Sequence, residues 1–418
     1  MESHPISRDL DYYKATMGQL EYERHPQEIV TFELKNRSCE LLSQYVTPDE
    51  LSARLNTLRS GWQPEEVAYL AGLITQDGRA QFSEEYLDFL MDNDLPPVDV
   101  SLDDANELTV KTTGPWPLVT FWETIVMSSI NELYYKNKLA ETDTSINDFY
   151  EEGDRRLSEK IALLKEHPDI QFSDFGTRRR FSYEWQHHVV KRLIQEIPGS
   201  IVGTSNIYLA NAHGITPIGT YAHEMPMVYA GLEDAKGNNP LIGHNKMVRD
   251  WQDRYGPTLS TALTDTFTTE FFLADSTPEQ TAQWKAFRHD SGDPFNFGDT
   301  LIEWLEAHSI NPLEKTIVFS DGLEIESIIE LNSYFKGRIK LLFGWGTTLT
   351  NDVGLKANNI VMKATRVNKT PTVKLSDVIT KHTGPSDTVE RYALEVKRVS
   401  QMGAAAWQSV CQEALVCA

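Results

Sequence analysis

From about residue 170 onward, short apolar runs alternate with longer stretches whose apolar residues have helical spacing, such as 184–195, 300–308 and 324–335. Strands that alternate with helices predict a parallel β-sheet. About eight such strands favour a closed β/α barrel over an open sheet. The predicted strands are Ile170–Phe172, Ile201–Val202, Pro217–Ile218, Thr258–Leu263, Ala286–Phe287, Thr316–Phe319, Arg338–Phe343 and Asn359–Lys363.

The N-terminal third of the chain has a more mixed pattern. Val30–Lys35 and Glu107–Thr112 alternate apolar and polar residues, which predicts two half-buried strands. Helical spacing predicts helices over 64–74, 84–91 and 118–135, the last of them after a break at the sequence GPWP.

Most of the predicted barrel strands are followed at once by a polar, glycine-rich turn. The ends of parallel barrel strands meet at one mouth, where active sites form, so this pattern predicts an enzyme. The turns are 174–180, 203–206, 219–224, 264–266, 288–293, 320–322 and 344–348.

Composition narrows the possible partners. The chain has 418 residues, with 39 Lys plus Arg against 61 Asp plus Glu, and its net charge is −22. Such an excess of negative charge disfavours binding to nucleic acid or to anionic membranes. No apolar run is long enough to span a membrane, and 1–10 lack the apolar core of a signal peptide. Cys39, Cys411 and Cys417 form no metal-binding spacing, so we expect a protein of the reducing cytoplasm.

Three turns contain residues suited to binding anions. Arg178, Arg179 and Arg180 follow a predicted strand, where they either form a solvated stretch or bind carboxylate or phosphate groups in a bidentate manner. The glycines at 344 and 346 allow close backbone approach to a phosphate, and 320–322 have a similar character.

Histidine and aspartate residues in other turns are candidates for catalysis. His223 follows a predicted strand and is either an ordinary hydrogen-bonded histidine or a nucleophile or general base. The turns also contain carboxylates that lack the spacing of a dedicated metal cage but could hold Mg²⁺ together with substrate phosphates. These carboxylates are Asp265, Asp290, Asp293 and Asp321.

Taken together, the turns resemble those of nicotinate phosphoribosyltransferases of the bacterial type, in the same order from about residue 8 to 380. The segments that carry the resemblance are DFGTRRR at 174–180, GTSN at 203–206, GTYAHE at 219–224, RHDSGDP at 288–294, FSD at 319–321 and FGWGT at 343–347. Further matches are DYYK at 11–14, GPW at 114–116 with Glu123, and KLSD at 374–377.

The resemblance implies an irregular β/α barrel over 141–370. A second α/β domain would consist of 1–140, completed by about 371–418. It also implies a homodimer with shared active sites. The implied reaction joins nicotinate to phosphoribosyl pyrophosphate, giving nicotinate mononucleotide and pyrophosphate, with Mg²⁺ as cofactor and ATP as co-substrate.

The resemblance also implies roles for individual residues. His223 would be phosphorylated by ATP, Arg288 would reach the acyl group of the substrate, and Asp290 would contact the ribose or the Mg²⁺–pyrophosphate group. Phe175 and the partner-contributed Tyr13 would sandwich the pyridine ring. The other implied ligands are Arg178 near the phosphates, Asp321 and Gly322 at the ribose or Mg²⁺, and Gly344, Gly346 and Thr347 at the 5-phosphate. Asp290 and Asp321 are the implied metal ligands.

One residue bears on the choice of substrate. Relatives that use nicotinamide carry an aspartate at the position of Ser205. That aspartate could accept a hydrogen bond from the amide of nicotinamide but would repel the carboxylate of nicotinate. A serine can donate to that carboxylate, so nicotinate is favoured. A preference for nicotinamide or quinolinate is the alternative within this class, and a ligand-binding descendant without chemistry is the alternative outside it.

Two departures from the family pattern are Trp345, in place of a small aliphatic residue, and Thr348, in place of an arginine.

Overall fold

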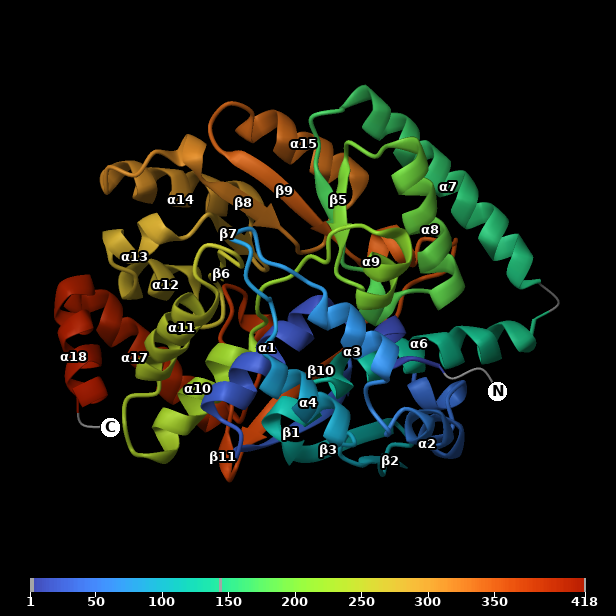
Figure 1. Cartoon of the computed structure of the whole chain (residues 1–418), viewed down its shortest axis with the longest axis horizontal. Coiled ribbons are helices and arrows are strands. Elements are labelled where there is room, and N and C mark those ends of the chain that lie inside the picture. The colour runs from blue at the N-terminus through green and yellow to red at the C-terminus, as the bar shows by residue number, and fades with distance from the viewer. Residues whose placement is uncertain (1–3, 143–144, 417–418) are drawn as a thin grey trace. The chain divides into compact units, whose positions relative to one another are not determined.

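The computed structural model describes residues 4–142 and 145–416 (Figure 1). The described residues group into two compact units. Unit 1 comprises those within 1–219, 323–325 and 343–363, and unit 2 those within 220–322, 326–342 and 364–418. The domain boundaries expected near residues 140 and 370 stay a prediction.

An antiparallel sheet lies in unit 1. Strand β3 (Leu108–Pro115) pairs with β1 (Ile29–Asn36) on one side and with β2 (Val98–Leu102) on the other, and Phe32 lies opposite Thr112. Strand β10 (Ile360–Val367) begins in this unit next to β1. The two strands predicted in the N-terminal third are therefore confirmed.

Parallel strands form a second sheet region of unit 1. Strand β4 (Phe172–Asp174) lies between β5 (Ile201–Thr204) and the last residues of β9 (Lys340–Trp345). Asp174 is paired with both Thr204 and Trp345. The polar turns that follow these strands consequently start at the same edge.

Helices account for most of the remaining structure of unit 1. The helix predicted over 118–135 is in fact two, α5 (Trp116–Val119) and the longer α6 (Trp122–Ala140). The other α-helices of the unit are α1 (Tyr12–Arg24), α2 (Pro48–Thr57), α3 (Pro64–Ala71), α4 (Glu84–Asp92), α7 (Ile146–Glu166), α8 (Tyr183–Glu196), α9 (Ile207–His213) and α16 (Thr347–Thr350). Short 3-10 turns are η1 (Ile6–Asp9), η2 (Leu42–Gln44) and η3 (Thr177–Arg179).

Unit 2 also contains parallel strands. Strand β7 (Ala286–His289) pairs with β6 (Thr261–Leu263) and with β8 (Thr316–Phe319), and the end of β10 pairs with β11 (Thr370–Pro371). The helices are α10 (Glu224–Ala235), α11 (Leu241–Tyr255), α12 (Thr269–Asp275), α13 (Pro278–Gln283), α14 (Pro294–Ala307), α15 (Ile325–Phe335), α17 (Ser386–Met402) and α18 (Ala404–Val416), with 3-10 turns η4 (Pro312–Glu314) and η5 (Ile379–Lys381).

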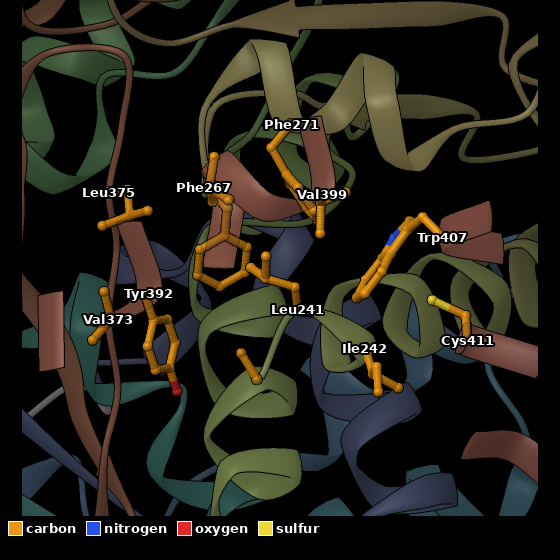
Figure 2. Close-up of a cluster of buried hydrophobic side chains, with 12 residues drawn as sticks. Leu241, Ile242, Phe267, Phe271, Val373, Leu375, Tyr392, Val399, Trp407 and Cys411 are labelled. Carbon is orange, nitrogen blue, oxygen red and sulfur yellow. The ribbon is translucent and has the colours of Figure 1, made fainter. Parts of the chain in front are cut away.

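A buried apolar cluster fixes the C-terminal helices of unit 2. Figure 2 shows Trp407 and Cys411 of α18 beside Ile242 of α11 and Val399 of α17. The indole Nε1 of Trp407 donates to Asp275 at the end of α12, over 2.5 Å. Burial of several large side chains, each of which contributes about 1.5–3 kcal/mol, holds α18 in place.

The mixed α/β fold with parallel strands is confirmed, but two predicted barrel strands are not. Pro217–Ile218 forms only an isolated bridge, between Pro217 and Thr204. Asn359–Lys363 instead contributes to β10 of the antiparallel sheet, in which residues 360–364 are alternately buried and half-buried. That alternation is typical of a strand with one covered face. Closure of the parallel strands into a barrel stays a prediction.

Two other expectations concern membranes and cysteines. Among the described residues, no helix combines the length and apolar character needed to cross a bilayer. Cys39 is exposed and Cys411 is buried, and both are free thiols. Cys417 lies outside the described residues.

Candidate active site

His223 lies at the centre of a polar cluster in unit 2, directly before α10. The residue is only 5% exposed. Its Nδ1 lies 2.9 Å from the hydroxyl of Thr266, and its Nε2 lies 2.9 Å from a carboxylate oxygen of Asp290 and 2.8 Å from the Nζ of Lys374. Both ring nitrogens are therefore held, which fixes the orientation of the imidazole.

The parallel strands explain why these partners meet. Thr266 follows β6 and Asp290 follows β7, and the two strands are adjacent, with Leu263 paired to Arg288. Lys374 comes from the segment after β11. The two residues that follow Lys374 donate their backbone N–H groups to the carbonyl of Thr266. The site thus combines strand ends with one segment from late in the chain.

The surroundings keep His223 neutral at physiological pH. Burial and the neighbouring Lys374 ammonium lower the pKa of His223 to about 4, although Asp265 and Asp290 act in the opposite direction. Burial alone would raise the pKa of Asp290, but Arg288 and His223 hold it well below its usual value. A buried neutral imidazole next to ionised carboxylates keeps a lone pair available for nucleophilic attack.

Arg288 and Asp290 form a second set of contacts, which reaches the end of β8. The Nε of Arg288 donates to the hydroxyl of Ser320 over 2.8 Å, and its Nη2 donates to Asp290 over 3.0 Å. Ser320 in turn donates to Asp290 over 2.9 Å. Next to Ser320, the Asp321 carboxylate accepts from Lys381 over 2.6 Å. Asp321 is followed by Gly322, whose φ of +59° suits a residue without a side chain.

The charges in this cluster are balanced. Three carboxylates face three cations, each within ion-pair distance of a partner, and the imidazole between them is neutral. The carboxylates are Asp265, Asp290 and Asp321, and the cations are Arg288, Lys374 and Lys381. Each of these three carboxylates therefore has a cation beside it, in contrast to the excess of negative charge in the protein as a whole.

The carboxylate oxygens of this cluster are of the kind that Mg²⁺ prefers as ligands. One oxygen of Asp265 is buried without a hydrogen-bond partner among the described residues, and it lies 3.7 Å from Nε2 of His223. The Lys374 ammonium already lies between these groups, 3.4 Å from Asp265, so a lysine cation fills that place. Asp290 and Asp321 have partly exposed side chains with oxygen donors, which fits a Mg²⁺ ion shared with substrate phosphates.

A second group of predicted residues lies in unit 1. The hydroxyl of Ser205, after β5, donates to Asp11 over 2.6 Å, and the backbone N–H of Tyr12 donates to the Ser205 carbonyl over 2.5 Å. These bonds attach the start of α1 to the turn after β5. The Ser205 hydroxyl therefore has a carboxylate acceptor within the protein, and its role toward a substrate stays a prediction.

Arg178 lies near two buried carboxylates in the same unit. Its guanidinium is 3.7 Å from Asp11 and 3.5 Å from Glu123, and its side chain is 30% exposed. Lys14 is 2.6 Å from Glu123. Burial alone would raise the pKa of Glu123, but Lys14, Lys363 and Arg178 lower it to about 2. Three cations thus lie close enough to Glu123 to stabilise its carboxylate.

The three consecutive arginines have different environments. Arg180 is fully buried and is ion-paired with Asp9 and with Glu132, so it is a structural residue. Arg179 is 3.5 Å from the amide oxygen of Asn359. The partly exposed Arg178 remains the best candidate of the three for a substrate ligand.

The glycine-rich turn after β9 packs against the turn after β4. Gly344 pairs with Ser173 in the sheet, and the N–H of Phe175 donates to the Trp345 carbonyl over 2.8 Å. A Cβ atom on Gly346 would lie 3.3 Å from the Phe175 carbonyl, so little space exists for a side chain there. Thr347 begins α16. The turn is consequently held close to Phe175.

Three further residues can be placed. Trp345 is fully buried and its Nε1 donates to Thr348 over 2.7 Å, while Thr348 donates to the Leu323 carbonyl. Both departures from the family pattern are thus joined in one internal network.

Tyr13 is 4% exposed in the single chain and lies beside Gly219. A Cβ atom on Gly219 would lie 2.9 Å from the backbone nitrogen of Tyr13.

The structure therefore brings the predicted residues together in two groups. His223, Arg288, Asp290 and Asp321 form the group in unit 2. Arg178 and Ser205 share Asp11 in unit 1, where Phe175 also contacts the turn of Gly344, Gly346 and Thr347. The convergence of both groups on one pocket stays a prediction.

Sequence reasoning missed the direct partners of several site residues. Lys374 belongs to the matching segment KLSD, but no role follows from that match, and Lys381 lies outside every matching segment. A lysine directly before the sequence LSD was the one available signal for Lys374. Lys381 lies in a polar loop with no distinguishing pattern.

Comparisons with known proteins agree with this arrangement. The model of the nicotinate phosphoribosyltransferase family matches residues 170–401, and the model of that family's N-terminal domain matches residues 9–131. The crystal structure of nicotinate phosphoribosyltransferase from Porphyromonas gingivalis is 31% identical, with a TM-score of 0.84, covering 94% of this chain and 100% of that one. The Vibrio cholerae enzyme of the same name is 28% identical, with a TM-score of 0.83, covering 98% of this chain and 97% of that one.

Proposed function

Since the chain belongs to the nicotinate phosphoribosyltransferase family, we propose that it joins nicotinate to phosphoribosyl pyrophosphate, coupled to ATP hydrolysis through a phosphohistidine, in NAD salvage. The observation that best supports the proposal is the buried, neutral His223 held by Thr266, Asp290 and Lys374. A purely binding protein would have no need for a neutral imidazole enclosed by ionised carboxylates and a lysine.

The proposed ATP step uses the Nε2 of His223 as the nucleophile. If Nδ1 carries the proton and donates to Thr266, then Nε2 has a free lone pair that accepts from Lys374 and makes no hydrogen bond to the Asp290 oxygen 2.9 Å away. Attack on the terminal phosphorus of ATP forms an N–P bond and breaks the P–O bond to ADP, which leaves. Lys374 is placed to balance the negative charge of the transferred phosphoryl group. Water then hydrolyses the phosphohistidine.

The proposed transfer step occurs at C1 of the ribose. The nicotinate ring nitrogen has a free lone pair and attacks C1 as the bond to pyrophosphate breaks. Positive charge develops on the ribose in this process, so the carboxylates Asp290 and Asp321 are suited to stabilise it. Arg288, held by Ser320, is suited to bind the carboxylate of nicotinate.

Mg²⁺ belongs to the proposal as cofactor. Asp290 and Asp321 would hold it together with the phosphates of the substrate. When bound, the ion neutralises negative charge on the departing pyrophosphate.

The group in unit 1 has complementary proposed roles. Phe175 and Tyr13 would stack on the pyridine ring, and Arg178 would bind a phosphate or carboxylate group. Ser205 would contribute to the preference for nicotinate. Gly344, Gly346 and Thr347 would offer backbone N–H groups to the 5-phosphate, and Gly322 in unit 2 would lie beside the ribose. A cytoplasmic homodimer that shares Tyr13 between subunits completes the proposal.

Comparative turnover tests the substrate. Purified protein is incubated with phosphoribosyl pyrophosphate, ATP and Mg²⁺, and with nicotinate, nicotinamide or quinolinate in separate reactions. We expect nicotinate to be converted fastest, with pyrophosphate released in equal amount. Turnover of nicotinamide or quinolinate without turnover of nicotinate would replace the proposed substrate, and no turnover of any of the three would favour a binding protein.

Labelling tests the phosphohistidine. With ATP labelled in its terminal phosphate, wild-type protein should acquire an acid-labile label that His223→Ala lacks. His308→Ala is the matched control, because His308 is an exposed histidine of unit 2. Label retained in His223→Ala would contradict the assignment.

A further inference from the structure

Lys381 makes contacts that none of the roles above explains. Its ammonium donates to the carboxylate of Asp321 over 2.6 Å and to the backbone carbonyl of Asp290 over 3.2 Å. Asp290 follows β7, and Asp321 follows β8. One side chain thus links the turns after two adjacent parallel strands.

The segment that carries Lys381 is fixed at several points. Lys374 and Thr383 exchange backbone hydrogen bonds of 3.1 and 2.9 Å, which close residues 374–383 into a loop. Within the loop, Ser376 is 2.9 Å from the hydroxyl of Ser291, and Asp377 accepts from the backbone N–H and the hydroxyl of Thr269. The loop therefore lies along the row of strand ends, with Lys374 at His223 and Lys381 at Asp321.

This arrangement differs from an ordinary surface ion pair. The side chains of Lys381 and Asp321 are 30% and 37% exposed, and an isolated pair of that kind contributes little to stability. The second bond, to the Asp290 carbonyl, gives the ammonium a fixed place on the backbone. The orientation of the Asp321 carboxylate is fixed in turn, because its partner cannot move freely.

We propose that Lys381 is a positioning residue that fixes and neutralises Asp321 for the binding of phosphoribosyl pyrophosphate, an inference that rests on the proposed function. In the absence of Mg²⁺, an Asp321 carboxylate that lacked the ammonium would face a highly anionic ligand unpaired and repel it. Loss of Lys381 should therefore weaken binding of the phosphoribosyl donor and leave the binding of nicotinate almost unchanged.

Calorimetry on the intact protein tests this separation. In Mg²⁺-free buffer we expect Lys381→Met to weaken the binding of phosphoribosyl pyrophosphate about tenfold, because the uncompensated Asp321 carboxylate then repels the anionic donor. The KM for nicotinate should change less than about twofold. Lys381→Arg, which keeps the charge and can reach the same acceptors, should restore most of the affinity. Lys397→Met is the control, because Lys397 is an exposed lysine on α17.

A double-mutant cycle separates positioning from direct contact. If Lys381 acts through Asp321, then Asp321→Asn combined with Lys381→Met should bind the donor no more weakly than Asp321→Asn alone. Multiplied effects would mean that Lys381 touches the substrate itself, and wild-type affinity in Lys381→Met would mean that it has no role. Either result would overturn the proposal. Because donor binding is measured without turnover, a failure of the nicotinate assay would count against the proposed function and not against this inference.

Discussion

Replacing Lys374 with methionine tests the electrostatics of His223. Burial and Lys374 are the two influences that lower the pKa of the imidazole, whereas the nearby carboxylates raise it. Methionine has similar length but no charge, so the pKa of His223 should rise in the variant. The fraction of neutral imidazole should then fall at acidic pH and remain high at alkaline pH.

The size of the effect follows from the pKa. With a pKa of about 4, only about 1% of His223 is protonated at pH 6. If loss of Lys374 returned the pKa to the ordinary value near 6.5, about three quarters would be protonated at that pH. Phosphorylation from ATP should therefore fall about fourfold more at pH 6 than at pH 8.5, where the imidazole is neutral in both proteins.

The assay is the initial rate of acid-labile label incorporation between pH 5 and pH 9. Wild-type protein should keep its rate down to about pH 5, and the Lys374→Met profile should fall below about pH 7. Lys374→Arg, which preserves the charge, should keep the wild-type midpoint. An unchanged midpoint in Lys374→Met, with a uniformly lower rate, would refute this explanation and assign Lys374 to the phosphoryl group alone.

Other predictions concern stability. Unfolded His223 binds a proton below about pH 6.5, whereas folded His223 binds one only below about pH 4. Its titration should therefore lower the free energy of unfolding by about 3 kcal/mol as the pH falls between these values. A urea midpoint of His223→Gln that falls as steeply with pH as that of the wild type would contradict this. Arg180→Met leaves Asp9 and Glu132 without their buried cation and should lower the free energy of unfolding by about 3–5 kcal/mol. Arg79→Met, at an exposed pair, should leave the urea midpoint almost unchanged. Equal urea midpoints for the two variants would argue against the structural role of Arg180. Gly243→Ala would place a Cβ atom 2.5 Å from the Ala230 nitrogen, between α10 and α11, and should lower the free energy of unfolding by about 1–3 kcal/mol. Gly199→Ala is the control, because its Cβ atom would meet no atom within 4 Å. Thermal unfolding of both variants checks the difference.

Local sequence patterns predicted most elements because they depend on residues close together in the chain. Alternation identified β1 and β3, and apolar runs followed by polar turns identified β4 to β9. The error at Asn359–Lys363 had a visible cause, since Ile360, Met362 and Ala364 alternate with less buried residues. An alternating strand suits an antiparallel sheet with one covered face, whereas a buried parallel strand is apolar throughout.

Partners across the fold could not be predicted in this way. Ser205 donates to Asp11, which is 194 residues away, and Lys374 reaches His223 across 151 residues. Such pairs depend on which strands become neighbours, and no local pattern encodes that. The resemblance to a known family predicts which residues form the site, but their ion pairs and hydrogen bonds required the three-dimensional arrangement.

We propose that ATP hydrolysis at His223 is coupled to phosphoribosyl transfer to nicotinate. Protein phosphorylated by ATP and then freed of nucleotide can be mixed with nicotinate and phosphoribosyl pyrophosphate, while the phosphoryl group on the His223 peptide and the nicotinate mononucleotide formed are both followed by mass spectrometry. We expect the phosphoryl group to disappear as the mononucleotide accumulates, and to disappear more slowly when nicotinate is omitted. A phosphoryl group on another residue, or one whose loss is independent of nicotinate, would contradict it.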